Sequence, residues 1–158
     1  MKTFILITLA TVLGFGLAQA QDKSTDLAII VGKASALESV TTAEVTKILR
    51  AEKSKGADGV KFALSIREAG SPERAALLSG IYSMTEAEYT KFFLQATFTG
   101  AVQSAPKQVA AAAGAKQFAA GTPGGISFVR GSDADDSVKV VKVDGKLPGE
   151  AGYPLKVK

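Results

Sequence analysis

The residues of this chain with the clearest chemical potential lie between Arg67 and Glu73, in the segment REAGSPE. An Arg guanidinium holds an oxyanion through two parallel hydrogen bonds, and backbone N–H groups at a helix N-terminus supply further donors and a positive dipole. The segment therefore predicts an anion site. In this hypothesis Arg67 clamps the ligand, Ser71 donates its hydroxyl, and the backbone N–H groups of Gly70, Ser71 and Glu73 complete the cradle.

The same residues also fit an ordinary helix start. Ser71 is a good N-cap, Pro72 suits the first helical position, and Glu73 complements the helix dipole. In this alternative Arg67 pairs with Glu68 or Glu73, and nothing binds. Both hypotheses stay open at the level of sequence.

The composition argues against an enzyme. The chain has no His and no Cys, which removes the common general base, the thiolate nucleophile and nearly all structural zinc sites. No nucleophile elbow, zinc-protease helix, phosphate loop or dinucleotide loop is recognisable. Asp133, Asp135 and Asp136 lack the ligand spacing and the closing Glu of a calcium loop, so we interpret them as a solvated turn. We expect no enzymatic activity, no metal and no cofactor.

Residue patterns place the candidate segment between a strand and a helix. Alternating apolar residues from Val60 to Ile66 predict a strand with one buried face, and the stretch from Pro72 to about Tyr82 predicts a helix. In open α/β sheets, ligands lie off the carboxyl ends of strands, where helices begin. The segment from Arg67 to Glu73 occupies such a place.

The remaining elements alternate in an α/β order. The apolar run 26–31 predicts a central, parallel strand that is buried on both faces. Three more helices are predicted at residues 42–50, 85–96 and 106–119, the first two opened by capping boxes. Two more strands are predicted at residues 125–129 and 137–143, the second at a sheet edge. This order predicts an α/β domain with a mixed, mostly parallel sheet sandwiched by helices.

Residues 1–20 are predicted to be a secretion signal, because a short apolar run ends in the A-x-A cleavage site Ala18-Gln19-Ala20. Residues 21–158 then form one periplasmic domain with no membrane span, and without Cys it is not a lipoprotein. The full chain has 19 Lys and Arg against 15 Asp and Glu. Loss of Lys2 leaves a net charge of +3, which is too small and too dispersed to predict nucleic-acid binding.

Several separated stretches resemble one family, the phosphate-type solute-binding proteins of ABC importers, which have the type II periplasmic binding protein fold. Residues 27–31 (LAIIV) are similar to the inter-domain strand of that family, and residues 37–44 (LESVTTAE) with Ile48 and Leu49 to the segment that leads into a short helix. Residues 66–71 (IREAGS) resemble its Arg-Ser-Asp-Gly-Ser-Gly-Thr ligand loop. Residues 122–129 (TPGGISFV) and 152–155 (GYPL) resemble its Thr-Pro-Gly-Ala-Ile-Gly-Tyr-Val strand and its closing Tyr-Pro-Leu.

The resemblance implies a single lobe of that fold and a periplasmic protein that binds phosphate or a related oxyanion for ABC-type transport. It also implies an importer permease as partner, and a homodimer is the simplest way to close a second surface over the anion. Pro72 and Glu73 replace a Gly and a Thr of the family's ligand loop, which removes an N–H donor and adds a negative charge. The alternative is a ligand-free relative that serves as a protein-interaction accessory module in the cell envelope.

Overall fold

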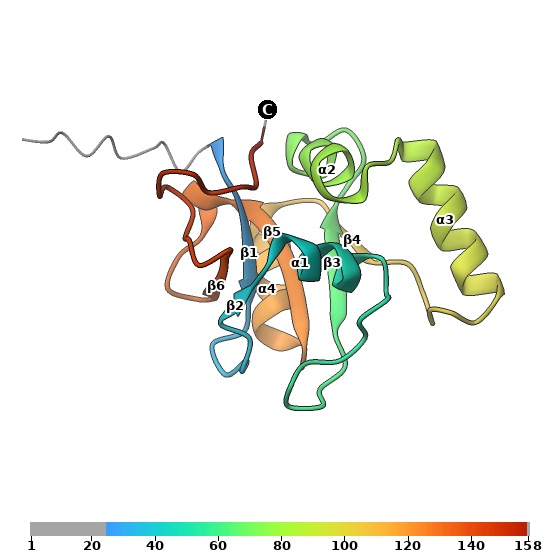
Figure 1. The fold of residues 1–158 in the computed structure, drawn as a ribbon, viewed down its shortest axis with the longest axis horizontal. Helices are drawn as coiled ribbons and strands as arrows, with labels where there is room; N and C mark the ends of the chain where they lie inside the picture. Colours follow the sequence, from blue (N-terminus) through green and yellow to red (C-terminus); the bar gives the residue numbers. More distant parts are fainter. Residues whose placement is uncertain (1–24, 158) are drawn as a thin grey trace, which may run out of the picture.

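The computed structural model describes residues 25–157, so the predicted signal at residues 1–20 lies outside the described part. Six strands of that part form one sheet in the order β2-β6-β1-β5-β3-β4 (Figure 1). The strands are β1 (Leu27–Val31), β2 (Ser39–Val40), β3 (Ala63–Arg67), β4 (Lys107–Val109), β5 (Gly125–Arg130) and β6 (Lys139–Val143). The helices are α1 (Thr42–Leu49), α2 (Pro72–Leu77), α3 (Glu86–Phe98) and α4 (Ala112–Gly121), with a π-helical turn η2 (Leu78–Tyr82) and a 3-10 turn η3 (Gly131–Asp133).

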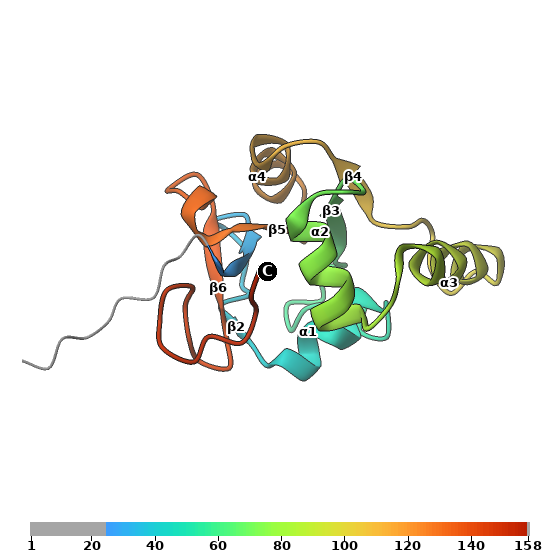
Figure 2. The same ribbon diagram turned by 90° about the horizontal axis from the view of Figure 1, so that it is seen from above.

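Helices cover both faces of the sheet, as predicted. On one face, Ile29, Phe128 and Ile66 pack in one core with residues of α1, α2, η2 and α3. On the other face, Ala28 and Ile30 pack against Ala115 and Ala119 of α4 and its neighbours. Figure 2 shows this layering from above, with α4 on one side of the sheet and α1 and α2 on the other. The fold is therefore an α/β sandwich around a mixed, mostly parallel sheet.

The central strand β1 corrects one prediction. It lies in the middle of the sheet and all five of its residues are buried, but it runs antiparallel to both neighbours, β5 and β6. The prediction of a parallel β1 was wrong because a continuous apolar run reports burial on two faces and carries no information on direction. Helices on both faces bury a central strand whichever way it runs.

The predicted helix at 106–119 begins later than expected. Residues 107–109 form β4, which pairs in parallel with Ser65, Ile66 and Arg67 of β3, and α4 starts only at Ala112. Pro106 suits a helix start, but β3 would otherwise expose unpaired backbone groups at the sheet edge, and pairing with β4 satisfies them. Sheet pairing outweighed the local helical preference here.

The strand at 137–143 also differs from expectation. β6 was predicted at an edge, but it lies between β1 and the two-residue strand β2, whose residues Ser39 and Val40 pair with Lys142 and Val143. A strand as short as β2 has no periodicity that a sequence pattern can reveal. Both Thr capping boxes are present as predicted, at Thr41 ahead of α1 and at Thr85 ahead of α3.

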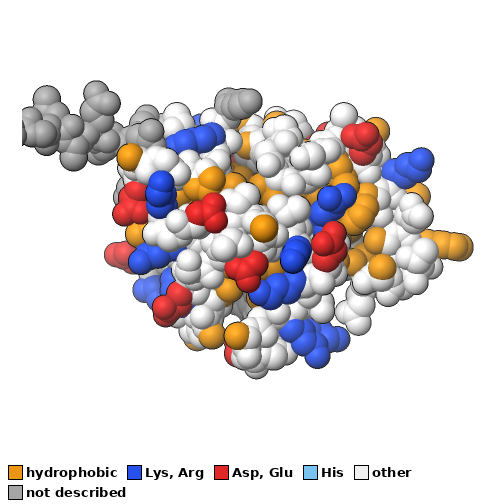
Figure 3. All heavy atoms as spheres, in the orientation of Figure 1, with side chains coloured by type: hydrophobic (Ala, Val, Ile, Leu, Met, Phe, Trp, Pro, Cys, Tyr) orange, Lys and Arg blue, Asp and Glu red, His pale blue; other side chains and the backbone are white. Residues whose placement is uncertain are grey.

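Acidic and basic side chains are interspersed on the molecular face shown in Figure 3. This distribution agrees with the modest net charge and gives no extended field of one sign on that face. Within residues 25–157, no helix is both long and apolar enough to cross a membrane.

Candidate anion-binding site

The candidate segment forms the strand, turn and helix start that its sequence predicts. β3 ends at Arg67, Gly70 has a φ of +87° in the turn, and α2 begins at Pro72. Glycine suits this position because a left-handed φ strains any residue that carries a Cβ. An alanine side chain would meet nothing within 4 Å at this position, so the turn faces open space.

The first turn of α2 satisfies its own donors. Ser71 is the N-cap, and its hydroxyl oxygen accepts from the Arg74 N–H at 3.3 Å while its O–H donates to the Glu68 carbonyl at 2.9 Å. The Ser71 N–H also bonds to the Glu68 carbonyl, at 3.3 Å, and Pro72 has no N–H to offer. These groups reproduce the ordinary helix start that the sequence also suggested.

The Glu73 carboxylate accepts from its own backbone N–H, one of the donors that the anion hypothesis gave to a ligand. Its side chain is only 7% exposed, and its carboxylate accepts from the Arg130 Nε at 2.8 Å. Burial raises the pKa of Glu73, but the hydrogen bond from its own backbone N–H, the Arg130 bond and the positive charge of Arg67 outweigh burial and hold that pKa below its usual range. The chain thus places a carboxylate of its own against the start of α2.

Arg67 is the least satisfied cation of the site. One terminal nitrogen donates to the Ala110 carbonyl at 3.0 Å, whereas its Nε is buried and has no hydrogen-bond partner in the described residues. Arg67 forms no ion pair with Glu68 or with Glu73 within residues 25–157, so the pairing expected in the helix-start alternative was wrong. A buried guanidinium N–H without an acceptor is costly, and an anion would supply the acceptor.

Two further arginines lie beside the candidate segment, and the sequence patterns did not predict either as a site residue. Arg130 ends β5, directly beside β3 in the sheet, and pairs with Glu73. Arg74 is buried, forms two bonds of 2.7 and 2.8 Å to the Glu86 carboxylate, and donates to the Arg67 carbonyl at 3.1 Å. The strand-end argument that selected Arg67 applies equally to Arg130, because it follows the predicted strand 125–129. Nothing in the sequence marked Arg74.

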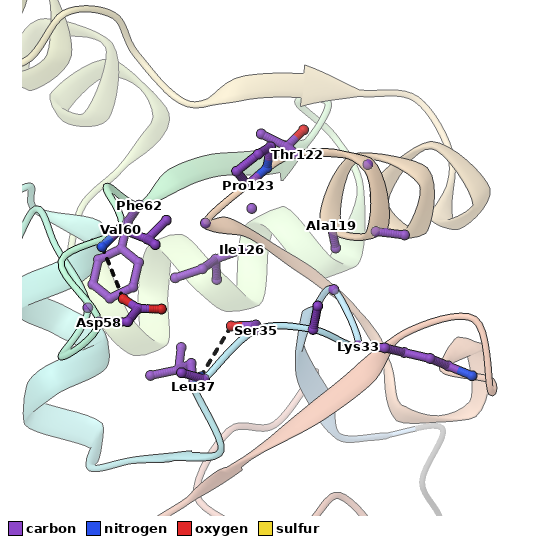
Figure 4. Close-up of a pocket in the computed structure, with 18 of the residues that line it drawn as sticks. Lys33, Ser35, Leu37, Asp58, Val60, Phe62, Ala119, Thr122, Pro123 and Ile126 are labelled. Carbon is purple, nitrogen blue, oxygen red and sulfur yellow. Dashed lines mark hydrogen bonds between the residues drawn. The ribbon is translucent and has the colours of Figure 1, made fainter.

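Two cavities lie near the end of the sheet that is opposite to Arg67. The first, of about 410 Å³, is shown in Figure 4, where Leu37, Val60, Phe62 and Ile126 line its apolar part. The second, of about 500 Å³, lies beside the start of β3 and the loop before β4. Within the described residues, no group of three or more acidic side chains is arranged to hold a metal ion, and Asp135 instead pairs with Lys116.

No protein-family model matches the chain, and no curated protein matches it in sequence. Solved structures do match its fold. One is an ABC-type phosphate transport receptor from Vibrio cholerae, with a TM-score of 0.63 and 18% identity over 78% of this chain. A second is a protein from Clostridium perfringens that is described as a putative phosphate ABC transporter substrate-binding protein and was solved with bound phosphate, with a TM-score of 0.63 and 19% identity over 78% of this chain. A third is PstS from Borrelia burgdorferi, with a TM-score of 0.63 and 15% identity over 85% of this chain.

The chain has the fold of part of a phosphate substrate-binding protein. The matches cover 48%, 47% and 55% of the three neighbours, so the chain spans about half the length of these substrate-binding proteins. The resemblance stated from the sequence is thereby confirmed at the level of fold. Identities of 15 to 19% carry no residue roles, which must come from the geometry of this chain itself.

Proposed function

We propose that this chain binds phosphate or a related oxyanion at Arg67 and acts as a solute-binding protein of ABC-type transport. The observation that carries the proposal is the buried Arg67 Nε, which has no hydrogen-bond partner within residues 25–157 and lies at the carboxyl end of a strand. This is where open α/β sheets hold ligands. The fold shared with a protein solved with bound phosphate supports phosphate as the first anion to test.

In the proposed complex the anion takes the place of the Glu73 carboxylate. Arg67 donates from Nε, and Arg130 turns from Glu73 to the ligand. The Glu73 backbone N–H, now bonded to its own side chain, becomes a donor to the anion. The Ser71 hydroxyl and the backbone around Gly70 border the same position. Displacing an internal carboxylate costs free energy, so we expect weaker binding than an empty cradle would give.

The proposed setting is the periplasm, after export directed by residues 1–20, with an ABC importer permease as partner. An anion held on one open surface is screened by water. Tight binding therefore calls for a second protein surface over Arg67, and a second copy of the chain is the simplest such surface.

A second function is favoured by the ion pair between Glu73 and Arg130. If that pair is permanent, the site has replaced its ligand by a side chain. The chain would then serve as a ligand-free, protein-interaction accessory module in the cell envelope. The two functions differ in whether any anion stabilises the fold.

Thermal denaturation of the chain with phosphate, sulfate, molybdate and carboxylates tests the anion proposal. A ligand at a hundredfold excess over Kd stabilises the folded state by about 2.7 kcal/mol, which raises the melting temperature by several degrees. Arg67→Ala should lower the shift by about half or more, as at least about tenfold weaker binding requires, and Ser71→Ala should also reduce it. Ser71→Ala also removes a helix cap worth about 1 kcal/mol, so the shift is compared rather than the melting temperature itself. If no anion raises the melting temperature of the wild type, the accessory-module function is favoured.

Replacing Glu73 by Gln should strengthen phosphate binding while weakening the fold. The glutamine side chain keeps the size of the original but no longer competes as an anion for Arg67 and Arg130, so we expect phosphate to bind about tenfold more tightly, a gain of about 1.4 kcal/mol. Titration calorimetry measures this change. The matched control is the exposed Glu38→Gln, which should leave the affinity unchanged. Equal or weaker binding by Glu73→Gln would show that the carboxylate does not occupy the anion position.

The same variant carries a pH signature. The folded-state pKa of Glu73 lies below its usual value of 4.5, so its ionised form stabilises the fold above about pH 4.5, and this contribution is lost as the pH falls through the lowered pKa. The melting temperature of Glu73→Gln should therefore fall less steeply than that of the wild type below pH 4.5. Parallel curves for the two proteins would contradict a stabilising role of the Glu73 carboxylate.

A further inference from the structure

The second cavity lies at the end of β3 opposite to Arg67. Its volume is about 500 Å³, and Lys61 to Leu64, at the start of β3, form one wall, while residues 100–107 form another. This volume falls in the range of about 300–1,000 Å³ that small-molecule pockets occupy. We refer to it as the lysine cavity, because Lys53, Lys61 and Lys107 are its charged lining residues and no Asp or Glu lines it.

The three lysines are not equally available. The Lys53 ammonium is 3.0 Å from the Glu44 carboxylate and is therefore compensated. Within residues 25–157, neither Lys61 nor Lys107 forms an ion pair. The Lys107 ammonium lies 5.9 Å from the centre of the Phe118 ring, which also lines the cavity. Two positive charges that have no acidic partner in the described part of the chain thus border one cavity.

Beside the lysines, the lining combines the polar residues Ser54, Gln103 and Ser104 with a set of apolar residues. Ile48, Leu64, Phe93, Val102 and Phe118 contribute side chains to it. Leu64 and Val102 are partly buried and pack against the main core cluster, so the floor of the cavity continues the core rather than the polar surface. An apolar floor with a cationic rim complements a molecule that has an apolar body and an anionic head.

The neighbouring cavity of about 410 Å³ gives an internal comparison. Its charged lining residues are one cation and one anion, Lys33 and Asp58, and Figure 4 shows the Lys33 side chain pointing away from the apolar side chains of the cavity. Of these two cavities, the lysine cavity is the one lined by cations without an acidic residue.

We propose that the lysine cavity binds a small amphiphilic anion, with the apolar body over Leu64, Val102 and Phe118 and the anionic head between Lys61 and Lys107. This site is independent of the anion site at Arg67, because the two lie at opposite ends of β3. Its ligand differs from phosphate in requiring an apolar body.

Titration calorimetry of the full chain with decanoate, below its micelle concentration, tests this site. Decyltrimethylammonium has the same apolar chain with the opposite charge, and acetate has the same head without the chain. We expect decanoate to bind at least about tenfold more tightly than either, since each lacks one of the two features that the cavity complements. Equal binding of decanoate and decyltrimethylammonium, or no binding of decanoate, would overturn the proposal.

A pair of double variants locates the site. Lys61→Gln with Lys107→Gln should weaken decanoate binding about tenfold or more, and because both side chains are exposed the melting temperature should change little. The control, Lys33→Gln with Lys142→Gln, removes the same charge elsewhere and should leave decanoate binding within about twofold. Equal losses in the two double variants would show unspecific attraction to a basic surface and would overturn the proposal.

Discussion

Gly124→Ala is expected to destabilise the fold by more than about 3 kcal/mol, enough to unfold much of a protein of ordinary stability. A Cβ at this position would lie 2.0 Å from the Lys61 carbonyl oxygen, far inside van der Waals contact, and the φ of +68° strains any residue other than glycine. The Gly124 carbonyl accepts from the Ala63 N–H at 3.0 Å. A shift of residue 124 would therefore separate the starts of β3 and β5, the strands that carry Arg67 and Arg130.

Urea denaturation of wild type and variant measures this effect. Gly80→Ala is the matched control, because a Cβ there would meet nothing within 4 Å and its φ is not positive. It should be neutral or stabilising by up to about 1 kcal/mol. A Gly124→Ala protein within about 1 kcal/mol of wild type would mean that Lys61 and Gly124 are not in close contact, and the register of β3 on β5 would need revision.

The second large effect is expected for Asp26→Ala, which should lower the free energy of unfolding by about 2–4 kcal/mol. Asp26 is fully buried, and its carboxylate accepts from the Gly149 N–H at 2.6 Å and from the Lys156 ammonium. Its carbonyl accepts from the Gly131 N–H at 2.8 Å. One residue thus joins the start of β1, the turn after β5 and the C-terminal segment 146–157. Removing the carboxylate leaves the Gly149 donor without this acceptor and takes a partner from Lys156.

Thermal and urea denaturation measure the loss, with the exposed Glu38→Ala as control, for which a change below about 0.5 kcal/mol is expected. Asp26→Asn separates charge from hydrogen bonding, since the amide oxygen still accepts from Gly149. Asp26→Asn should therefore lose less stability than Asp26→Ala. An Asp26→Ala protein as stable as wild type would show that the C-terminal segment is held without the Asp26 carboxylate, by contacts such as the bonds from the Tyr153 hydroxyl to the Leu27 carbonyl and from the Leu27 N–H to the Leu155 carbonyl.

Local sequence patterns predicted the parts of the site that depend on neighbouring residues. Ser71 and Pro72 begin α2 as expected because a cap and a fixed φ act within one turn. The two Thr capping boxes follow for the same reason. The fold class and the family resemblance were also accessible, because strands and helices alternate along the chain and the matching stretches keep their order.

Features that depend on residues far apart in the chain could not be predicted from the sequence. The direction of β1, the pairing of β4 with β3 and the position of β2 beside β6 are set by sheet partners far away in sequence. The same applies to the charges of the site. Glu73 finds Arg130, 57 positions away, rather than Arg67, and Arg67 instead donates to the Ala110 carbonyl. Sequence patterns identified Arg67 and Glu73 as candidate site residues but could not predict their hydrogen-bond and ion-pair partners.

The central claim is that Arg67 holds an anion in competition with Glu73. Titration calorimetry of inorganic phosphate into the wild-type chain, Arg67→Ala and the control Arg50→Ala tests it most directly. We expect saturable binding by the wild type and by Arg50→Ala, and at least about tenfold weaker binding by Arg67→Ala, because bonds from a guanidinium to an oxyanion are worth about 1.5–3 kcal/mol. Absence of binding in the wild type, or equal binding in all three proteins, would contradict the claim.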